Sequence, residues 1–211
     1  MSNEELSRLL TEQYPLVHRV ARGLRGEDRA AQIEPKVFSK SLHHCERWRD
    51  EDEARSWFLH HTILHCRNTP APPAVSWAGP AAERIEIRPM VKAFFALPIQ
   101  QREAFLLSRG ETLTLQQVAV AMDCSKTAAG NHLAAAEKML NLFAGPESAT
   151  MIGLLLEAYA APPPPENLVI SRTVRRSAWR KFSRRMLKLI LLLLLAAAIW
   201  WAWQNRRTLG Y

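Results

Sequence analysis

Residues 97–140 have the sequence LPIQQREAFLLSRGETLTLQQVAVAMDCSKTAAGNHLAAAEKML, which predicts three successive helices. Pro98 suits the first turn of a helix, where its missing N–H is not needed. Gly110 suits the end of that helix, because glycine tolerates the positive φ that often follows a helix C-terminus. Thr114 and Gln117 form a capping-box pattern that starts the next helix. The first two helices are therefore short and clearly bounded.

The third helix of this stretch begins after a tight turn at Asp123 and Cys124, with Ser125 as its N-cap. Its apolar positions recur at spacings of four, three and four, at Ala129, Leu133, Ala136 and Leu140. The helix before it has its own buried face, formed by Val118, Ala119 and Met122. Such a helix-turn-helix commonly places its last helix in the major groove of DNA.

The lead-in LPIQQREAFLL, joined without a gap to TLTLQQVAVAMDCS, resembles region 4 of the extracytoplasmic-function (ECF) sigma factors, which are specificity subunits of RNA polymerase. The other interpretation is a different three-helix regulator domain. The resemblance implies that the last helix contacts promoter DNA through Ser125, Lys126, Thr127, Ala128, Asn131 and His132. In such contacts Asn pairs with adenine by two hydrogen bonds, while Ser, Thr and Lys hold phosphates.

The contact helix departs from the family where relatives typically carry Lys or Arg, at Gly130, His132, Ala134, Ala135 and Glu137. Residues 111–143 hold two lysines and three acidic residues, a net charge of −1. Each lost phosphate contact lowers the salt-dependent affinity for DNA. We therefore expect weak autonomous DNA binding, and the alternative for these residues is a solvated helix face.

The N-terminal half predicts three more helices. The first covers residues 2–25, where we expect Pro15 to break or kink it, and a polar turn at 25–29 follows. The second starts at Glu34-Pro35, and the third covers about 54–67. The segments EQYPLVHRVARGL, KVFSKSL and RWRDEDEARSWFL resemble region 2 of the same sigma factors, in the same order.

Region 2 of the family docks on the polymerase through an acidic helix, so the resemblance implies polymerase contacts at Glu34, Lys36, Val37, Phe38 and Leu42. Lys36 stands where relatives carry an acid, which weakens the expected docking because a basic group of the partner then lacks its pair. The resemblance also implies that Arg47, Trp48, Arg49 and Trp57 contact melted promoter DNA by stacking and phosphate pairing. The alternative is that Trp57 is core and the arginines are solvated.

The net charge of +8 belongs to the C-terminal tail. Residues 167–211 hold ten Lys and Arg and no acid, which leaves 18 basic against 20 acidic residues over 1–166. Residues 186–203 carry a single charge, Lys188, and at about 1.5 Å per residue such a helix approaches the ~30 Å core of a bilayer. Eight basic residues precede the unbroken apolar run and two follow it, which predicts one span with the N-terminal domains in the cytoplasm. A fully buried soluble helix is the alternative.

Seven His and Cys residues gather in the N-terminal half and leave two interpretations open, a metal site or ordinary helix residues: His43, His44, Cys45, His60, His61, His65 and Cys66. His61 and His65 share a helical face at a spacing that zinc sites use, but without a recognised finger or a CxxC pair. We expect no metal, no cofactor and no enzyme activity, because the sequence carries no catalytic motif. Three cysteines form no even framework, which favours a reducing compartment.

The sequence therefore predicts an all-α protein with two small helical domains and one transmembrane helix. The expected divisions are a region 2-like domain at 1–68, a Pro-rich linker at 69–86, a region 4-like domain at 87–145, an extra helix at 146–161, a Pro-rich then basic segment at 162–185, the span at 186–203 and an external tail at 204–211.

The expected function is that of an ECF-like sigma factor tethered to the cytoplasmic membrane. Its expected partners are core RNA polymerase, promoter DNA, membrane lipid through residues 186–203, and an anti-sigma factor or other regulator. The alternative is a sigma-derived, membrane-anchored adaptor without promoter recognition of its own.

Overall fold

The computed structural model describes residues 3–45, 47–70, 77, 84–162, 169–175, 179, 186, 190, 192–198 and 200–201. Within these ranges the elements are helices and no strand occurs. The prediction of an all-α fold is confirmed.

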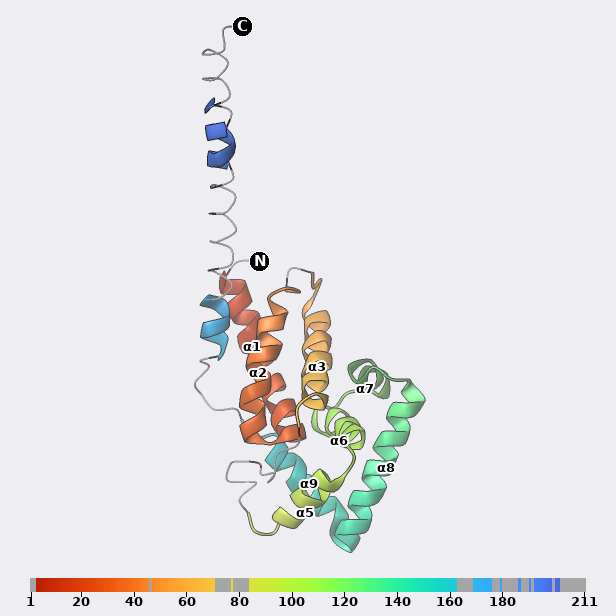
Figure 1. The fold of residues 1–211 in the computed structure, drawn as a ribbon. Coiled ribbons are helices and arrows are strands. Elements are labelled where there is room, and N and C mark those ends of the chain that lie inside the picture. The colour runs from red at the N-terminus through yellow and green to blue at the C-terminus, as the bar shows by residue number, and fades with distance from the viewer. Residues whose placement is uncertain are drawn as a thin grey trace, which may run out of the picture.

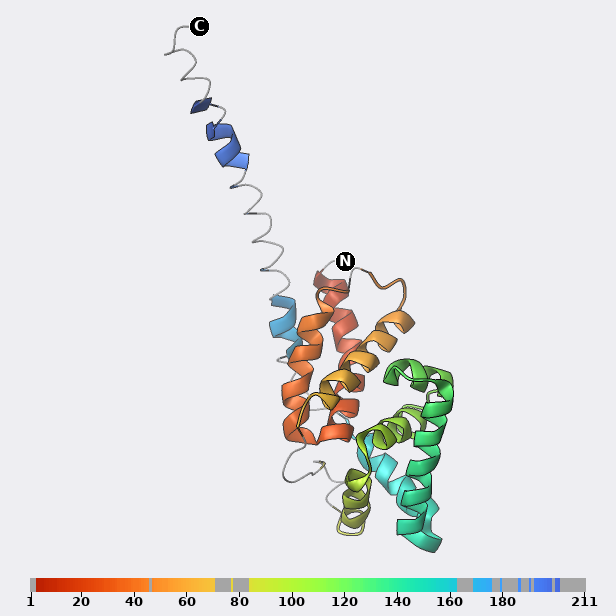
Figure 2. The same cartoon turned by 45° about the vertical axis from the view of Figure 1, so that its right-hand side comes forward.

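The N-terminal half is a bundle of three helices, α1 (Asn3–Arg25), α2 (Glu27–Ser41) and α3 (Glu51–Arg67), which lie side by side in Figures 1 and 2. Of the two expected effects of Pro15, a break is wrong, because α1 continues through it and buries side chains on both sides of the proline, and a kink stays a prediction. The predicted polar turn at 25–29 is also wrong, because Gly26 alone reverses the chain with a φ of 81°. The second helix therefore starts seven residues before the expected Glu34.

The C-terminal half contains α5 (Arg88–Ala96), α6 (Ile99–Phe105), the π-helical turn η1 (Leu106–Gly110), α7 (Leu115–Met122) and α8 (Lys126–Ala144). The predicted caps are confirmed: Thr114 and Gln117 form the capping box of α7, and the Ser125 side chain accepts from the Ala128 N–H at 3.1 Å. Asp123 makes the turn between α7 and α8 in the left-handed conformation, with a φ of 54°. These elements form the predicted helix-turn-helix.

Gly110 ends its helix for a different reason from the one predicted. Its φ is not positive, and the chain passes through it in a π-helical turn whose Glu111 N–H donates to the Leu106 carbonyl at 2.9 Å. A Cβ at this position would lie 2.5 Å from Cε1 of Tyr159, so the glycine is needed for space. That contact comes from a helix 49 residues further along the chain, which local sequence patterns do not reveal.

Helix α9 (Ser148–Tyr159) follows the short 3-10 turn η2 (Gly145–Glu147) and packs into the centre of the protein. Its buried side chains Leu155, Ala158 and Tyr159 belong to the same core as α1 and α5. Figure 1 shows α9 beside α5 at the lower end of the N-terminal bundle. The predicted extra helix therefore exists, and it joins the two halves.

The helical stretch Lys126–Tyr159 is long and apolar enough to cross a membrane by length and composition. Gly145, with a φ of 61°, divides this stretch into α8 and α9, and both helices place side chains in the shared core. We therefore assign it to the folded part of the protein.

The predicted membrane span falls partly outside the described residues. Within 186–203 the described positions are 186, 190, 192–198, 200 and 201, and all of them are helical and exposed. A helix that is apolar all round and exposes large side chains, such as Leu193 and Trp201, suits a lipid environment. The span stays a prediction, as do the divisions of the chain at 162–185 and 204–211.

Candidate nucleic-acid interface

The predicted DNA-contact helix, α8, presents most of its contact residues to solvent. Ser125, Lys126, Thr127 and Asn131 are exposed, and Ala128 and His132 are half-buried. The opposite face is anchored because Ala129, Ala136 and Leu140 are buried in the core. The 3.6-residue period of the apolar positions therefore places the predicted contacts on one accessible face.

This face carries little positive charge. Lys126 and Lys138 are its lysines, and Glu137 accepts from Arg109 Nε at 2.6 Å, so the charge of that arginine is paired. The N-terminus of α8 adds the partial positive charge of its backbone N–H groups, to which a phosphate binds readily. The helix suits a few phosphate contacts near Ser125 and Lys126 rather than a long track along DNA.

The loop between α2 and α3 holds the second set of predicted DNA contacts. Arg47 and Arg49 are exposed, and Trp48 is half-buried against the rings of Trp57 and Phe58, at centroid distances of 5.3 and 5.4 Å. Trp57 is also half-buried and stacks on His61 at 3.9 Å. The structure therefore combines both interpretations, with solvated arginines and aromatic rings that are only partly core.

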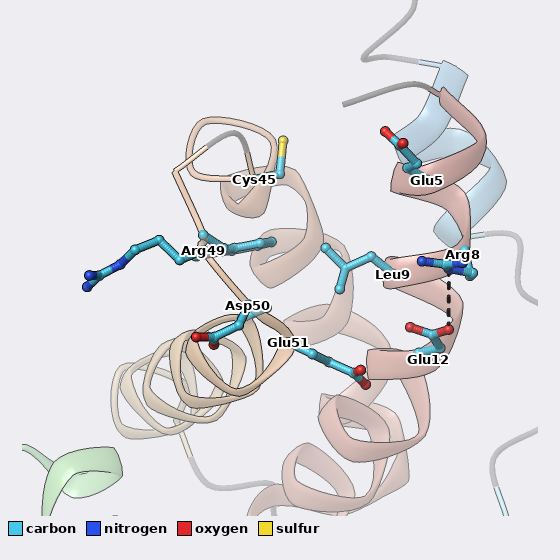
Figure 3. Close-up of a pocket in the computed structure, with 10 residues that line it drawn as sticks. Glu5, Arg8, Leu9, Glu12, Cys45, Arg49, Asp50 and Glu51 are labelled. Atoms are coloured by element: carbon cyan, nitrogen blue, oxygen red, sulfur yellow. Dashed lines mark ion pairs between the residues drawn. The ribbon is translucent and has the colours of Figure 1, made fainter.

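A hollow of about 740 Å³ lies beside this loop, between α1 and the start of α3 (Figure 3). Its charged lining includes four acids against two arginines, namely Glu5, Glu12, Asp50, Glu51, Arg8 and Arg49. Arg8 lies 3.7 Å from Glu12, and Figure 3 shows the Arg49 side chain pointing away from α1. Such a lining repels phosphate, so melted DNA would reach Trp48 against the local charge.

The residues predicted to bind polymerase divide into two groups. Glu34, Val37 and Phe38 are buried in the N-terminal bundle, where Glu34 Oε1 lies 2.8 Å from Nδ1 of the buried His18. Lys36 is exposed and Leu42 is half-buried. The exposed residues of α2 include Lys36 and Lys40, which line a hollow of about 470 Å³ with His43 and His65. The polymerase contacts stay a prediction.

Sequence patterns missed an apolar groove of about 610 Å³ between α5 and α8. Its walls include Ala93, Leu97, Met139 and Phe143, and Met139 and Phe143 are each 53% exposed. Exposed apolar patches of this kind mark protein-binding surfaces. The signal was present in the sequence, because Met139, Leu142 and Phe143 fall outside the buried period of α8.

The His and Cys residues do not form a metal centre in the described part of the chain, where no group of three or more His, Cys, Asp and Glu is placed to hold an ion. His61 Nδ1 lies 3.1 Å from the Trp57 carbonyl, and burial lowers the pKa of His61 to about 4, helped by nearby Lys40. Cys66 is fully buried, and burial raises the pKa of its thiol. These residues pack the N-terminal bundle.

Comparison with known proteins identifies the second half. Residues 91–140 match the family model for sigma-70, region 4, over the helix-turn-helix described above. Residues 91–140 are therefore assigned to sigma-70 region 4. The resemblance predicted from LPIQQREAFLL and TLTLQQVAVAMDCS is therefore confirmed, and the interpretation as an unrelated three-helix regulator is excluded.

A solved structure has a fold similar to that of this chain. The chain is similar to the sigma factor RpoE in a co-crystal structure with the anti-sigma factor NepR from Bartonella quintana, with a TM-score of 0.51 and 16% sequence identity. The similarity covers 66% of this chain and 94% of that chain. No curated protein matches the sequence. The likeness concerns the fold, and α9 follows the matched region 4 in this chain.

Proposed function

We propose that this protein binds core RNA polymerase, directs promoter-specific transcription initiation, and acts from the cytoplasmic face of a membrane. The observation that carries the proposal is the region 4 helix-turn-helix, in which most of the predicted contact residues are exposed at the start of α8. The apolar groove between α5 and α8 supports a protein partner for the same domain. Because the matched sigma factor was crystallised with an anti-sigma factor, a regulator of that kind is part of the proposal.

A second function is favoured by the charge of the two candidate DNA surfaces. The hollow beside Trp48 is mainly acidic, and α8 carries few unpaired cations. A membrane-anchored adaptor that retains the sigma fold and binds polymerase without recognising a promoter would tolerate both features.

Reconstitution separates the two functions. The full-length protein in nanodiscs is mixed with core polymerase and genomic DNA fragments, and bound polymerase and transcripts are measured. Promoter-specific transcripts support the sigma factor. Polymerase binding without specific transcripts supports the adaptor, and the absence of both results contradicts both functions.

Substituting Lys36→Glu should tighten core-polymerase binding by about three- to tenfold, because it restores an acid where the family has one and removes a like-charge contact. The measurement is the equilibrium affinity at low and at physiological salt, since an exposed charge effect weakens with ionic strength. Arg88→Glu is the matched control, because it makes the same charge change at an exposed position of α5. Equal effects of the two substitutions would show that net charge alone is responsible.

The membrane tether has its own test. The full-length protein should float with lipid vesicles and resist alkaline extraction, because a run of 18 residues with one charge partitions strongly into a bilayer. A chain ending at residue 185 should stay in the soluble fraction. Flotation of the shortened chain would assign membrane binding to the basic segment at 172–185 instead.

A further inference from the structure

The contact between the two halves is built around Tyr159, the last residue of α9, whose side chain is 1% exposed. Its ring lies against two glycines, one from each half of the protein. A Cβ on Gly23 of α1 would lie 2.6 Å from Tyr159 Cε2, and one on Gly110 of η1 would lie 2.5 Å from Cε1. Any side chain at either glycine would exclude the ring from its present position.

The hydroxyl group of Tyr159 is held by a buried polar network. It donates to Glu111 Oε1 at 2.8 Å, and the Glu111 carboxylate accepts from Arg19 Nε and Nη2 at 3.0 and 2.9 Å. Burial, followed by the charge of Glu111, raises the pKa of the Tyr159 hydroxyl well above its usual value, so it remains a donor. The network therefore joins α1, the end of η1 and α9.

The backbone at the end of α9 is also held by the N-terminal half. Arg22 Nη2 donates to the carbonyls of Ala158 and Tyr159 at 3.0 and 2.6 Å. The positive charge of Arg22 also interacts favourably with the negative, C-terminal end of the α9 helix dipole. Trp77 covers the ring from the side of the linker, at a centroid distance of 6.3 Å from Tyr159, and is 4% exposed.

The same arrangement fixes the two candidate DNA surfaces relative to each other. Helix α7 packs on α3, where His60 Nδ1 lies 3.3 Å from the Ala121 carbonyl and Arg67 Nη2 donates to the Met122 carbonyl at 3.0 Å. The DNA-contact helix α8 and the loop at 47–50 therefore have a fixed position relative to each other. Two domains that read separate DNA elements need the freedom of the linker between them.

We propose that α9 is a clasp that holds the two halves closed, and that its withdrawal lets them separate and increases their affinity for polymerase. The effect on polymerase rests on the proposed function, whereas the closing of the halves does not. Tyr159 precedes Pro162 by three residues, so the clasp is directly connected to the segment that leads to the predicted span.

Glycine substitutions test the clasp through the ring of Tyr159. Gly110→Ala places a methyl group against the Tyr159 ring alone, whereas the methyl group of Gly23→Ala would also lie 2.7 Å from Leu106 Cδ1; alanine favours the helical conformation of both sites. Gly153→Ala is the matched control, because it lies in α9 itself and a Cβ there meets nothing within 4 Å. All variants are prepared as full-length protein in nanodiscs.

The first readout is single-molecule energy transfer between dyes on the exposed positions 40 of α2 and 142 of α8. Wild type and Gly153→Ala should show one narrow efficiency distribution, and Gly110→Ala and Gly23→Ala should shift to a broad distribution. Hydrogen exchange of the α9 amides should accelerate at least tenfold in the same two variants. Unchanged efficiency and exchange in both variants, or an equal shift in Gly153→Ala, would overturn the clasp.

The second readout is affinity for core polymerase, which should rise about fivefold in Gly110→Ala relative to Gly153→Ala, as expected when a binding-competent state becomes more populated. Opening without a change in affinity would overturn the regulatory role and leave the clasp intact. If no variant binds polymerase, the proposed function fails and the regulatory role fails with it, while the energy-transfer result still decides whether α9 closes the halves.

Discussion

Replacement of Arg67 by methionine should lower the free energy of unfolding at neutral pH by about 3 kcal/mol, because it leaves a buried carboxylate without its main cation. Glu103 is 0% exposed, and Arg67 donates to its Oε2 at 2.6 Å and to its Oε1 at 2.9 Å. The positive charges of Arg102 and Arg25 also stabilise the Glu103 carboxylate. The expected loss of stability therefore lies at the lower end of the range for a buried ion pair that has lost one partner. Methionine is chosen because its side chain replaces most of the aliphatic part of the Arg67 side chain.

The same variant should regain stability as the pH falls. Burial raises the pKa of Glu103, and Arg67 opposes that shift, so removing Arg67 raises the pKa of Glu103 further. Between the unfolded pKa of about 4.3 and the raised folded value, the native state binds more protons than the unfolded state, so stability increases toward lower pH and levels off below both values. Urea denaturation of the full-length protein in detergent, from pH 8 to pH 5, measures this effect.

Substituting both residues of the pair provides the control. In Arg67→Met, Glu103→Gln the buried group cannot ionise, so much of the lost stability should return and the additional pH dependence should disappear. Equal stability of the single and double variants across the pH range would show that Glu103 is already neutral, and would contradict the assignment of a buried ion pair.

Local patterns predicted the helix-turn-helix because its boundaries are set by neighbours in sequence. Thr114 and Ser125 are bonded to residues three positions away, and such caps need no knowledge of the rest of the fold. The turn at Gly26 was predicted too long. Polar residues suggested a turn over 25–29, whereas a single glycine with positive φ reverses the chain.

Contacts between distant residues could not be predicted in this way. Arg19 and Glu111 are 92 positions apart, and Arg67 and Glu103 are 36 apart. Nothing in the local sequence of either partner identifies the other. The Pro-rich linker predicted at 69–86 divided the chain into two small domains, whereas these ion pairs, together with α9, hold the two halves together in the described structure.

The candidate surfaces, too, were only partly predictable from the sequence. The exposed contact residues of α8 follow from its helical period, but Val37 and Phe38 could not be assigned from sequence, because core positions and partner-binding positions have the same apolar side chains. The acidic hollow beside Trp48 is assembled from α1 and the start of α3. Its charge, which weakens the case for melted DNA, depends on how those helices pack.

Replacement of Tyr159 by alanine should cost about 3 to 5 kcal/mol of unfolding free energy, because it empties the space of a fully buried aromatic ring. Tyr159→Phe should cost only about 1 to 2 kcal/mol, since it keeps the ring and removes the hydrogen bond to the Glu111 carboxylate. Leu142→Ala, at a position that is 69% exposed, is the control and should change stability by less than about 0.5 kcal/mol.

The form of the unfolding curve distinguishes a clasp from ordinary core packing. Because Tyr159 contacts Gly23 in one half and Gly110 in the other, its loss should uncouple the halves, so that one unfolding transition becomes two. A ring that only filled the core of the C-terminal half would lower the midpoint of that half and leave α1 unaffected. Hydrogen exchange in α1 therefore decides between the two roles: faster exchange around Arg19 and Gly23 in Tyr159→Ala, but not in Leu142→Ala, is expected if α9 couples the halves.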